Sequence, residues 1–148
     1  MLSFGRHSSN RPILGDDDIY FVDLGMVIEG VETDLAVTVG TGTTFQSVAN
    51  ASQDIWHQVA AFWRENHKTV SGIEMYNKAS DLALENGLIL DLSEGGHRIG
   101  PFPHDRTPPN DLKYIQCPVE CSEWVLEIKV IDFKNKVGSF FESPLILE

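Results

Sequence analysis

The sequence has few cysteines, few basic residues and no long apolar run, and each scarcity excludes a class of protein. Cys117 and Cys121 are the only two cysteines; three residues separate them, where a zinc knuckle has two, and no second pair exists. A disulfide-stapled fold and a complete cysteine zinc site are therefore excluded. We expect two free thiols, with a local disulfide or half of a metal site as the alternatives.

Basic residues are outnumbered by acidic ones, 11 to 22, and the formal net charge is -11. Because nucleic acids and anionic membranes both attract positive surfaces, we expect neither as a partner. No apolar run reaches membrane-spanning length, and the amino-terminal residues lack the apolar stretch of a signal peptide. The sequence predicts a soluble cytoplasmic protein, and its 148 residues, 42% of them hydrophobic, suffice for one domain.

A hairpin with two aspartates is predicted near the amino terminus. The residues before Glu29-Gly30 are β-branched, aromatic and aliphatic, and that dipeptide has the chemistry of a turn. Asp23 and Asp34 lie on opposite arms, and their odd index sum allows both side chains to project from one face. Two such carboxylates on an apolar ribbon suggest a bound cation, because they would otherwise be neutralised. The alternative is that both are solvated on the open face of a sheet.

Two helices are predicted after the hairpin. Apolar residues recur at roughly helical spacing over residues 45–66. Ser71 followed by Glu74 is typical of a capping box, and Asn86-Gly87 is typical of a helix end, so a second helix is expected over residues 71–86.

The carboxyl-terminal half contains acids inside strand-like runs. Glu127 lies in WVLEIKVID and Glu142 in FFESPLILE, two predicted strands joined by a turn at KNKVG. Charged side chains in such runs require a partner. The proline-rich residues 101–120 lack periodicity and predict a long loop that serves a site.

Two histidines occur in the segment EGGHRIGPFPHD. Paired glycines before His97 allow the backbone to approach another group closely, and a histidine held by such a turn fits a metal ligand. The alternative is a hydrogen-bonded structural histidine. His104 follows seven positions later.

These motifs, in this order, resemble the dinuclear metallopeptidase superfamily of methionine aminopeptidase, aminopeptidase P and Xaa-Pro dipeptidase, which has the pita-bread fold. The matching segments are FVDLG, VETDLAVTV, GGHRIG, VLEI and FFESPLIL. The resemblance implies an α+β fold with a curved antiparallel sheet and covering helices, incomplete at the amino terminus. Residues 1–14 would be an extension, and residues 15–148 a partial catalytic domain.

The resemblance also implies a site for two divalent metal ions, Mn²⁺ first, with Co²⁺, Fe²⁺ or Zn²⁺ as alternatives. Its ligands would be four acids and one histidine: Asp23, Asp34, His97, Glu127 and Glu142. Asp23 would chelate one ion, and His97 with Glu127 would hold the other. Asp34 and Glu142 would bridge the pair.

Four further roles follow from the same resemblance. Glu127 would also transfer a proton, and His104 would bind substrate and stabilise the tetrahedral intermediate. His7 would be a second substrate-binding histidine, and Thr38 would support the ligands. The chain departs from the family at residues 36–38, where Ala-Val-Thr replaces Thr-Arg-Thr, and at residues 127–129, where Glu-Ile-Lys replaces Glu-Pro-Gly.

The predicted function is a metal-dependent exopeptidase, nearer to Xaa-Pro dipeptidase or aminopeptidase P, that hydrolyses the amino-terminal residue of short peptides. The alternatives are a non-catalytic protein-binding module on the same fold and a plain acidic α+β domain. Two helices are too few to cover the whole sheet, and IYFVDLG is apolar at nearly every position. We therefore expect a homodimer or a partner chain bound through residues 1–22 and the hairpin's outer face.

Overall fold

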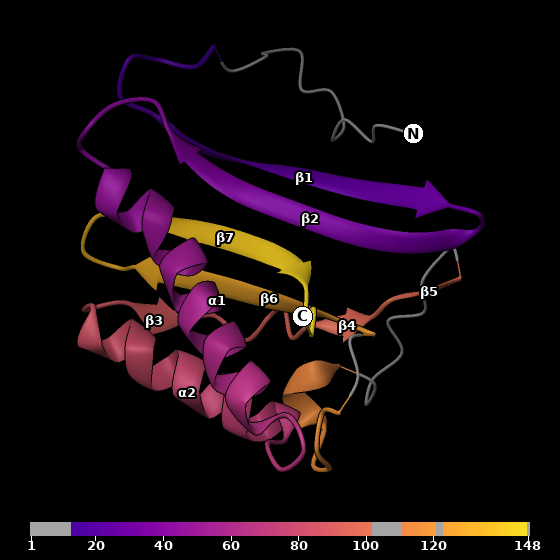
Figure 1. The fold of residues 1–148 in the computed structure, drawn as a ribbon. Helices are drawn as coiled ribbons and strands as arrows, with labels where there is room; N and C mark the ends of the chain where they lie inside the picture. The colour runs from indigo at the N-terminus through magenta and orange to yellow at the C-terminus, as the bar shows by residue number, and fades with distance from the viewer. Residues whose placement is uncertain (1–12, 102–110, 121–122, 148) are drawn as a thin grey trace.

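The structure is a computed structural model that describes residues 13–101, 111–120 and 123–147, which form one antiparallel sheet and two α-helices (Figure 1). The strands have the spatial order β1-β2-β7-β6-β3, with β4 paired to β6 and β5 paired to β2. No helix among the described residues is long and apolar enough to cross a membrane. The elements are β1 (Ile19–Ile28), β2 (Val31–Gly40), α1 (Gln46–Asn66), α2 (Gly72–Glu85), β3 (Ile89–Leu90), β4 (His97–Arg98), β5 (Gly100–Pro101), the short 3-10 helix η1 (Leu112–Tyr114), β6 (Trp124–Asp132) and β7 (Val137–Pro144).

The β1–β2 hairpin has the two-residue turn that the sequence predicts. Glu29 and Gly30 have φ angles of 52° and 83°, and two-residue hairpin turns of this left-handed kind match the twist of the strands. In the register, Asp23 is opposite Ala36 and Gly25 is opposite Asp34. The two aspartates therefore share a face, as predicted, but they are diagonal neighbours rather than directly opposed.

Both helices form where the sequence predicts them. The Ser71 hydroxyl accepts a hydrogen bond from the Glu74 N–H, and the Glu74 carboxylate accepts one from the Ser71 N–H, which completes the capping box. Gly87, with a φ of 70°, follows the end of α2. Local sequence chemistry thus sets the beginning and the end of α2.

The core lies between the two helices and one face of β6 and β7. The Trp56 indole of α1 donates to the Leu126 carbonyl at 2.9 Å, and the Trp63 indole donates to the Val119 carbonyl at 2.7 Å. Leu126, Ile128 and Val130 of β6 belong to this core. Because side chains alternate along a strand, Glu127 points to the face of the sheet away from the helices.

The carboxyl-terminal half differs from the prediction in its boundaries. The turn after β6 ends at Lys136, with a φ of 56°, so Val137 and Gly138 belong to β7, and residues 145–147 are not strand. The predicted loop over residues 101–120 contains the 3-10 helix η1, whose buried Leu112 donates its N–H to the Gly96 carbonyl. These elements depend on distant pairing partners, which local sequence does not reveal.

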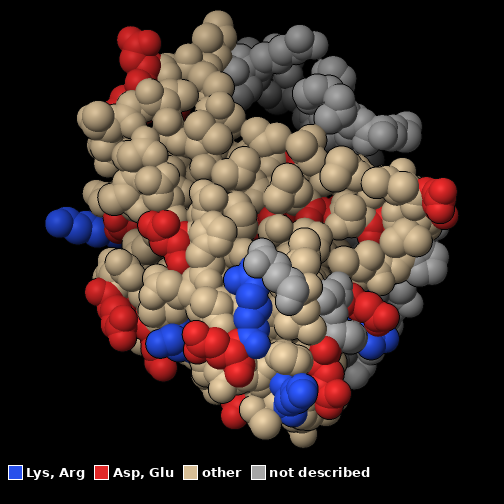
Figure 2. Space-filling model, in the orientation of Figure 1, with Lys and Arg blue, Asp and Glu red and all other residues tan. Residues whose placement is uncertain are grey.

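The outer face of the hairpin is apolar and exposed. Five side chains on the face opposite the aspartates are 39% to 65% exposed: Val22, Met26, Ile28, Val31 and Leu35. Among the described strands, β1 pairs with β2 alone and is an edge. Among the described residues, Figure 2 shows no lysine or arginine in the upper part of the view, over these two strands. An exposed apolar edge of this kind favours association with another chain.

Candidate metal centre

A cleft of about 180 Å³ lies on the sheet face away from the helices. Seven described residues line it: Phe21, Asp23, Glu94, Glu127, Lys129, Phe140 and Glu142. Four of these seven are acidic. A larger hollow of about 550 Å³ beside α1 includes a single acid, Asp54, in its described lining. The smaller cleft is therefore the candidate site, because its carboxylates concentrate negative charge in a partly enclosed space.

Glu127 and Glu142 form the centre of the cleft. They are directly opposite one another in the β6–β7 pairing, and they are only 3% and 2% exposed. Burial, followed by the nearby carboxylates of Glu127, Asp23 and Asp34, raises the pKa of Glu142 to about 9. Without a cation, Glu142 therefore retains its proton at neutral pH.

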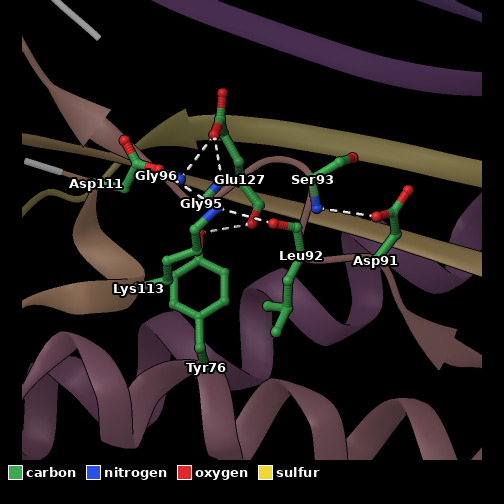
Figure 3. A network of polar contacts seen from close by, with 9 residues as sticks. All are labelled: Tyr76, Asp91, Leu92, Ser93, Gly95, Gly96, Asp111, Lys113 and Glu127. Atoms are coloured by element: carbon green, nitrogen blue, oxygen red, sulfur yellow. Dashed lines mark hydrogen bonds and ion pairs between the residues drawn. The ribbon is translucent and has the colours of Figure 1, made fainter. Parts of the chain in front are cut away.

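The Glu127 carboxylate is fixed by the two glycines that precede His97. The N–H groups of Gly95 and Gly96 donate to Glu127 Oε2 at 3.0 and 2.7 Å (Figure 3). Gly96 has a φ of 67°, and a Cβ added there would lie 2.7 Å from the Val125 carbonyl oxygen. The close approach predicted for the paired glycines is therefore an approach to β6 and to the Glu127 side chain.

Neighbouring residues hold this glycine loop and the Glu127 backbone in place. Lys113 Nζ donates to the Leu92 carbonyl at 2.8 Å, and the Lys113 N–H donates to the Gly95 carbonyl at 2.9 Å (Figure 3). The Tyr76 hydroxyl donates to the Glu127 carbonyl at 2.9 Å. Burial and the charge of Glu127 raise the pKa of Tyr76 well above its usual value, so the hydroxyl keeps the proton that it donates.

His97 approaches the carboxylates from β4, which pairs with β6. Its Nδ1 lies 3.1 Å from the Arg98 carbonyl oxygen, and a carbonyl can only accept, so we assign the proton of the neutral ring to Nδ1. Its Nε2 lies 3.2 Å from Asp34 Oδ2, and both residues are buried. This tautomer leaves Nε2, the atom facing Asp34, as the ligating nitrogen.

The cluster has the composition of a divalent-metal site. His97, Glu127 and Glu142 each offer a ligand atom, and these atoms lie within 4.8 Å of one another. Glu142 Oε2 is buried and has no hydrogen-bond partner among the described residues. Carboxylate oxygens and an imidazole nitrogen suit Mn²⁺, Fe²⁺, Co²⁺ or Zn²⁺. A bound cation would satisfy this oxygen and offset the carboxylate repulsion, so the residues fit the metal.

Three of the five predicted ligands, Asp23, Glu127 and Glu142, line the cleft, and His97 offers a ligand atom within 4.8 Å of those of the two glutamates. Asp34 joins the group of three through its contact with His97, and Asp23 is an exposed residue of the cleft wall. The Thr38 hydroxyl bridges β2 to β7, donating to the Phe140 carbonyl and accepting from its N–H, and so supports the ligands through the backbone. His7 and His104 lie outside the described residues.

Four cleft residues were missed in the sequence, Glu94 among them, and a simple signal marks the other three. Phe21 precedes Asp23 by two positions, Lys129 follows Glu127 by two, and Phe140 precedes Glu142 by two. Residues two apart on a strand share a face, so the spacing alone could have placed these side chains beside the ligands.

Comparison with solved structures gives neighbours of the same fold at low sequence identity. A methionine aminopeptidase from Thermotoga maritima superposes with a TM-score of 0.69 at 17% identity, over 92% of this chain and 63% of that one. An X-Pro aminopeptidase from the same organism superposes with a TM-score of 0.64 at 19% identity, over 88% of this chain and 37% of that one. A prolidase from Pyrococcus horikoshii superposes with a TM-score of 0.64 at 20% identity, over 99% of this chain and 42% of that one.

The chain thus spans less than two thirds of the length of each of these proteins, and their likeness supports the pita-bread fold. A search of curated proteins finds no match. Residues 2–129 match the model of Metallopeptidase family M24, which is most of the chain. The chain therefore belongs to metallopeptidase family M24.

Proposed function

We propose that this protein is a metal-dependent exopeptidase that releases the amino-terminal residue of short peptides, of the Xaa-Pro dipeptidase or aminopeptidase P type. The observation that carries the proposal is the convergence of buried acids and a histidine on one cleft, with a Glu142 oxygen that lacks a hydrogen-bond partner among the described residues. Such a cluster is unfavourable without a cation. Membership of a metallopeptidase family supports the reaction class.

Two divalent ions would be held by Asp23, Asp34, His97, Glu127 and Glu142, with Mn²⁺ as the first candidate. When bound, they would supply a water of lowered pKa and an electrophile for the scissile carbonyl. Glu127 is suited to proton transfer because Oε2 is fixed by two N–H donors while the carboxylate lines the cleft. The roles of His104 in stabilising the intermediate and of His7 in binding substrate remain predictions.

Metal binding tests the site directly. Purified protein titrated with Mn²⁺ or Co²⁺ in a calorimeter should bind close to two ions and gain thermal stability, because ligand binding stabilises the folded state. Asp34→Ala and Glu142→Ala should each weaken metal binding at least about tenfold, since the ligand is lost. Glu85→Gln, on the exposed end of α2, is the charge-matched control. Unchanged metal content and melting temperature in both ligand variants would refute the site.

Hydrolysis tests the reaction class. Metal-loaded protein should release the first residue from Ala-Pro and from longer peptides with proline second, and a chelator should abolish the activity. His104→Ala should lower kcat while metal stays bound, because its proposed contact is with the transition state. If the loaded protein binds metal but cleaves no short peptide, the non-catalytic binding module becomes the better description.

A further inference from the structure

Lys129 is the one cation among the described residues that line the cleft, and no step of the proposed reaction uses it. It lies two residues after Glu127 on β6, so the two side chains share a face. Phe140 is opposite Lys129 in the β6–β7 pairing, as Glu142 is opposite Glu127. The Lys129–Phe140 pair is therefore the next pair on this face of the sheet after the Glu127–Glu142 pair, about 7 Å along the strand.

The Lys129 ammonium is held in place on one side. Nζ lies 3.1 Å from Asp91 Oδ2 and donates to Ser93 Oγ at 2.9 Å. The Ser93 N–H and the Lys129 ammonium lower the pKa of Asp91, so this carboxylate remains charged. An ammonium has three N–H donors, and these two contacts use two of them. The third can serve a ligand, since the side chain is 37% exposed and lines the cleft.

An apolar wall lies beside this cation. The rings of Phe21 and Phe140 are 5.9 Å apart between centroids, at an angle of 81°, and both line the cleft. An edge-to-face pair of this kind offers a surface for an aliphatic side chain or a prolyl ring. The row beyond the predicted ligands thus combines an apolar surface with one positive charge.

We propose that Lys129 binds a carboxylate on the peptide substrate beyond the scissile bond, while Phe21 and Phe140 contact the apolar residue that carries it. The cleft would then prefer short peptides with a free carboxyl terminus. This inference rests on the proposed exopeptidase function and adds the substrate class. A carboxylate can come from the chain terminus or from an acidic side chain, and the terminus is the source proposed here because the apolar wall disfavours a second charge.

The test compares matched peptides on the metal-loaded protein. Ala-Pro and Ala-Pro-amide differ only in the terminal carboxylate, and Ala-Glu-amide against Ala-Gln-amide measures a side-chain carboxylate. N-acetylproline and N-acetylprolinamide give dissociation constants by calorimetry without hydrolysis. Lys129→Met removes the charge, Lys129→Arg keeps it, and Lys134→Met removes an exposed lysine from the β6–β7 turn as the control.

The wild-type protein should prefer Ala-Pro to its amide, and Lys129→Met should raise KM for Ala-Pro about tenfold with little change for the amide or in metal content. Lys129→Arg should retain most of the preference, and Lys134→Met should leave it intact. Asp91→Asn should keep the preference, because it removes the tether but not the ammonium. If Lys129→Met and Asp91→Asn slow both peptides equally, Lys129 only anchors the loop and the proposal is wrong.

The two proposals fail in different ways. Hydrolysis of Ala-Pro and its amide with equal KM would refute the carboxylate site and leave the exopeptidase intact. Selectivity for Ala-Glu-amide over Ala-Gln-amide alone would assign Lys129 to an acidic side chain and overturn the terminal-carboxylate proposal. If no peptide is cleaved, the exopeptidase proposal fails, and the binding of N-acetylproline against N-acetylprolinamide still decides the role of Lys129.

Discussion

Glu142→Gln should stabilise the metal-free protein at neutral pH, although it removes a predicted metal ligand. The Glu142 carboxyl has a pKa of about 9 in the folded protein, against an ordinary value of 4.5 for a glutamate side chain. Because the folded pKa is raised, the unfolded chain releases this proton first as pH rises. The cost to folding is absent below about pH 4.5, grows above it, and reaches its full size near pH 9.

The magnitude follows from the pH interval over which the two states differ. Between pH 4.5 and pH 7 the penalty grows by about 1.4 kcal/mol for each pH unit, which gives roughly 3 kcal/mol at pH 7. Glutamine has nearly the shape of the protonated acid and does not titrate. The variant should therefore match the wild type near pH 4.5 and exceed its free energy of unfolding by about 3 kcal/mol at pH 7.

Urea denaturation at pH 5, 6, 7 and 8 in the presence of a chelator measures this difference, and Glu85→Gln controls for the lost charge. Adding Mn²⁺ should reverse the order, because the metal stabilises only the protein that retains its ligand. If the free energies of unfolding of variant and wild type differ by the same amount from pH 5 to pH 8, the reasoning is wrong, because a packing effect alone does not change with the protonation of Glu142.

Two further predictions concern the glycine loop and the hairpin. Gly96→Ala should lower the free energy of unfolding by about 2 to 4 kcal/mol in a denaturant titration, because its φ is positive and the new Cβ would meet the Val125 carbonyl oxygen. Gly87→Ala has a similar φ with nothing within 4 Å, so it should cost only about 1 kcal/mol, and equal losses would exclude the close contact. We also propose that two copies of this chain associate through the apolar outer face of the hairpin. Sedimentation at micromolar concentrations should then show a dimer. Met26→Glu, on this face, should dissociate the dimer, and Val27→Glu, on the opposite face, should not. A wild-type protein that remains monomeric throughout would exclude this interface.

Elements with local causes were predictable from the sequence. The hairpin needs two residues with positive φ, and Glu29-Gly30 supplies them at the turn. The second helix needs a cap, and Ser71 with Glu74 supplies it. The sharing of one face by Asp23 and Asp34 followed from the two-residue period of a strand. In each case a few adjacent residues fix the conformation.

Elements with distant causes were not predictable in this way. Strand β4 has two residues, and it exists because His97 pairs with Val125 on β6. The glycine loop takes its position from Lys113, which follows Gly96 by 17 residues and carries no recognisable motif. The sequence therefore indicated which residues could bind a metal, but the backbone donors that fix Glu127 emerged only from the fold.

The way Glu127 is fixed bears on how strongly the cleft can attract a cation. Two N–H donors hold its carboxylate and Tyr76 holds its carbonyl, so Glu127 cannot move far from Glu142 to relieve their repulsion. Thr38 ties β7 to β2 by two hydrogen bonds at Phe140, which limits the same relief from the other strand. A proton on Glu142 is then the remaining way to relieve the repulsion in metal-free protein. Because a cation and this proton compete for the same oxygens, metal binding should release the proton, and the restraints that raise the pKa also prepare the ligands for the metal.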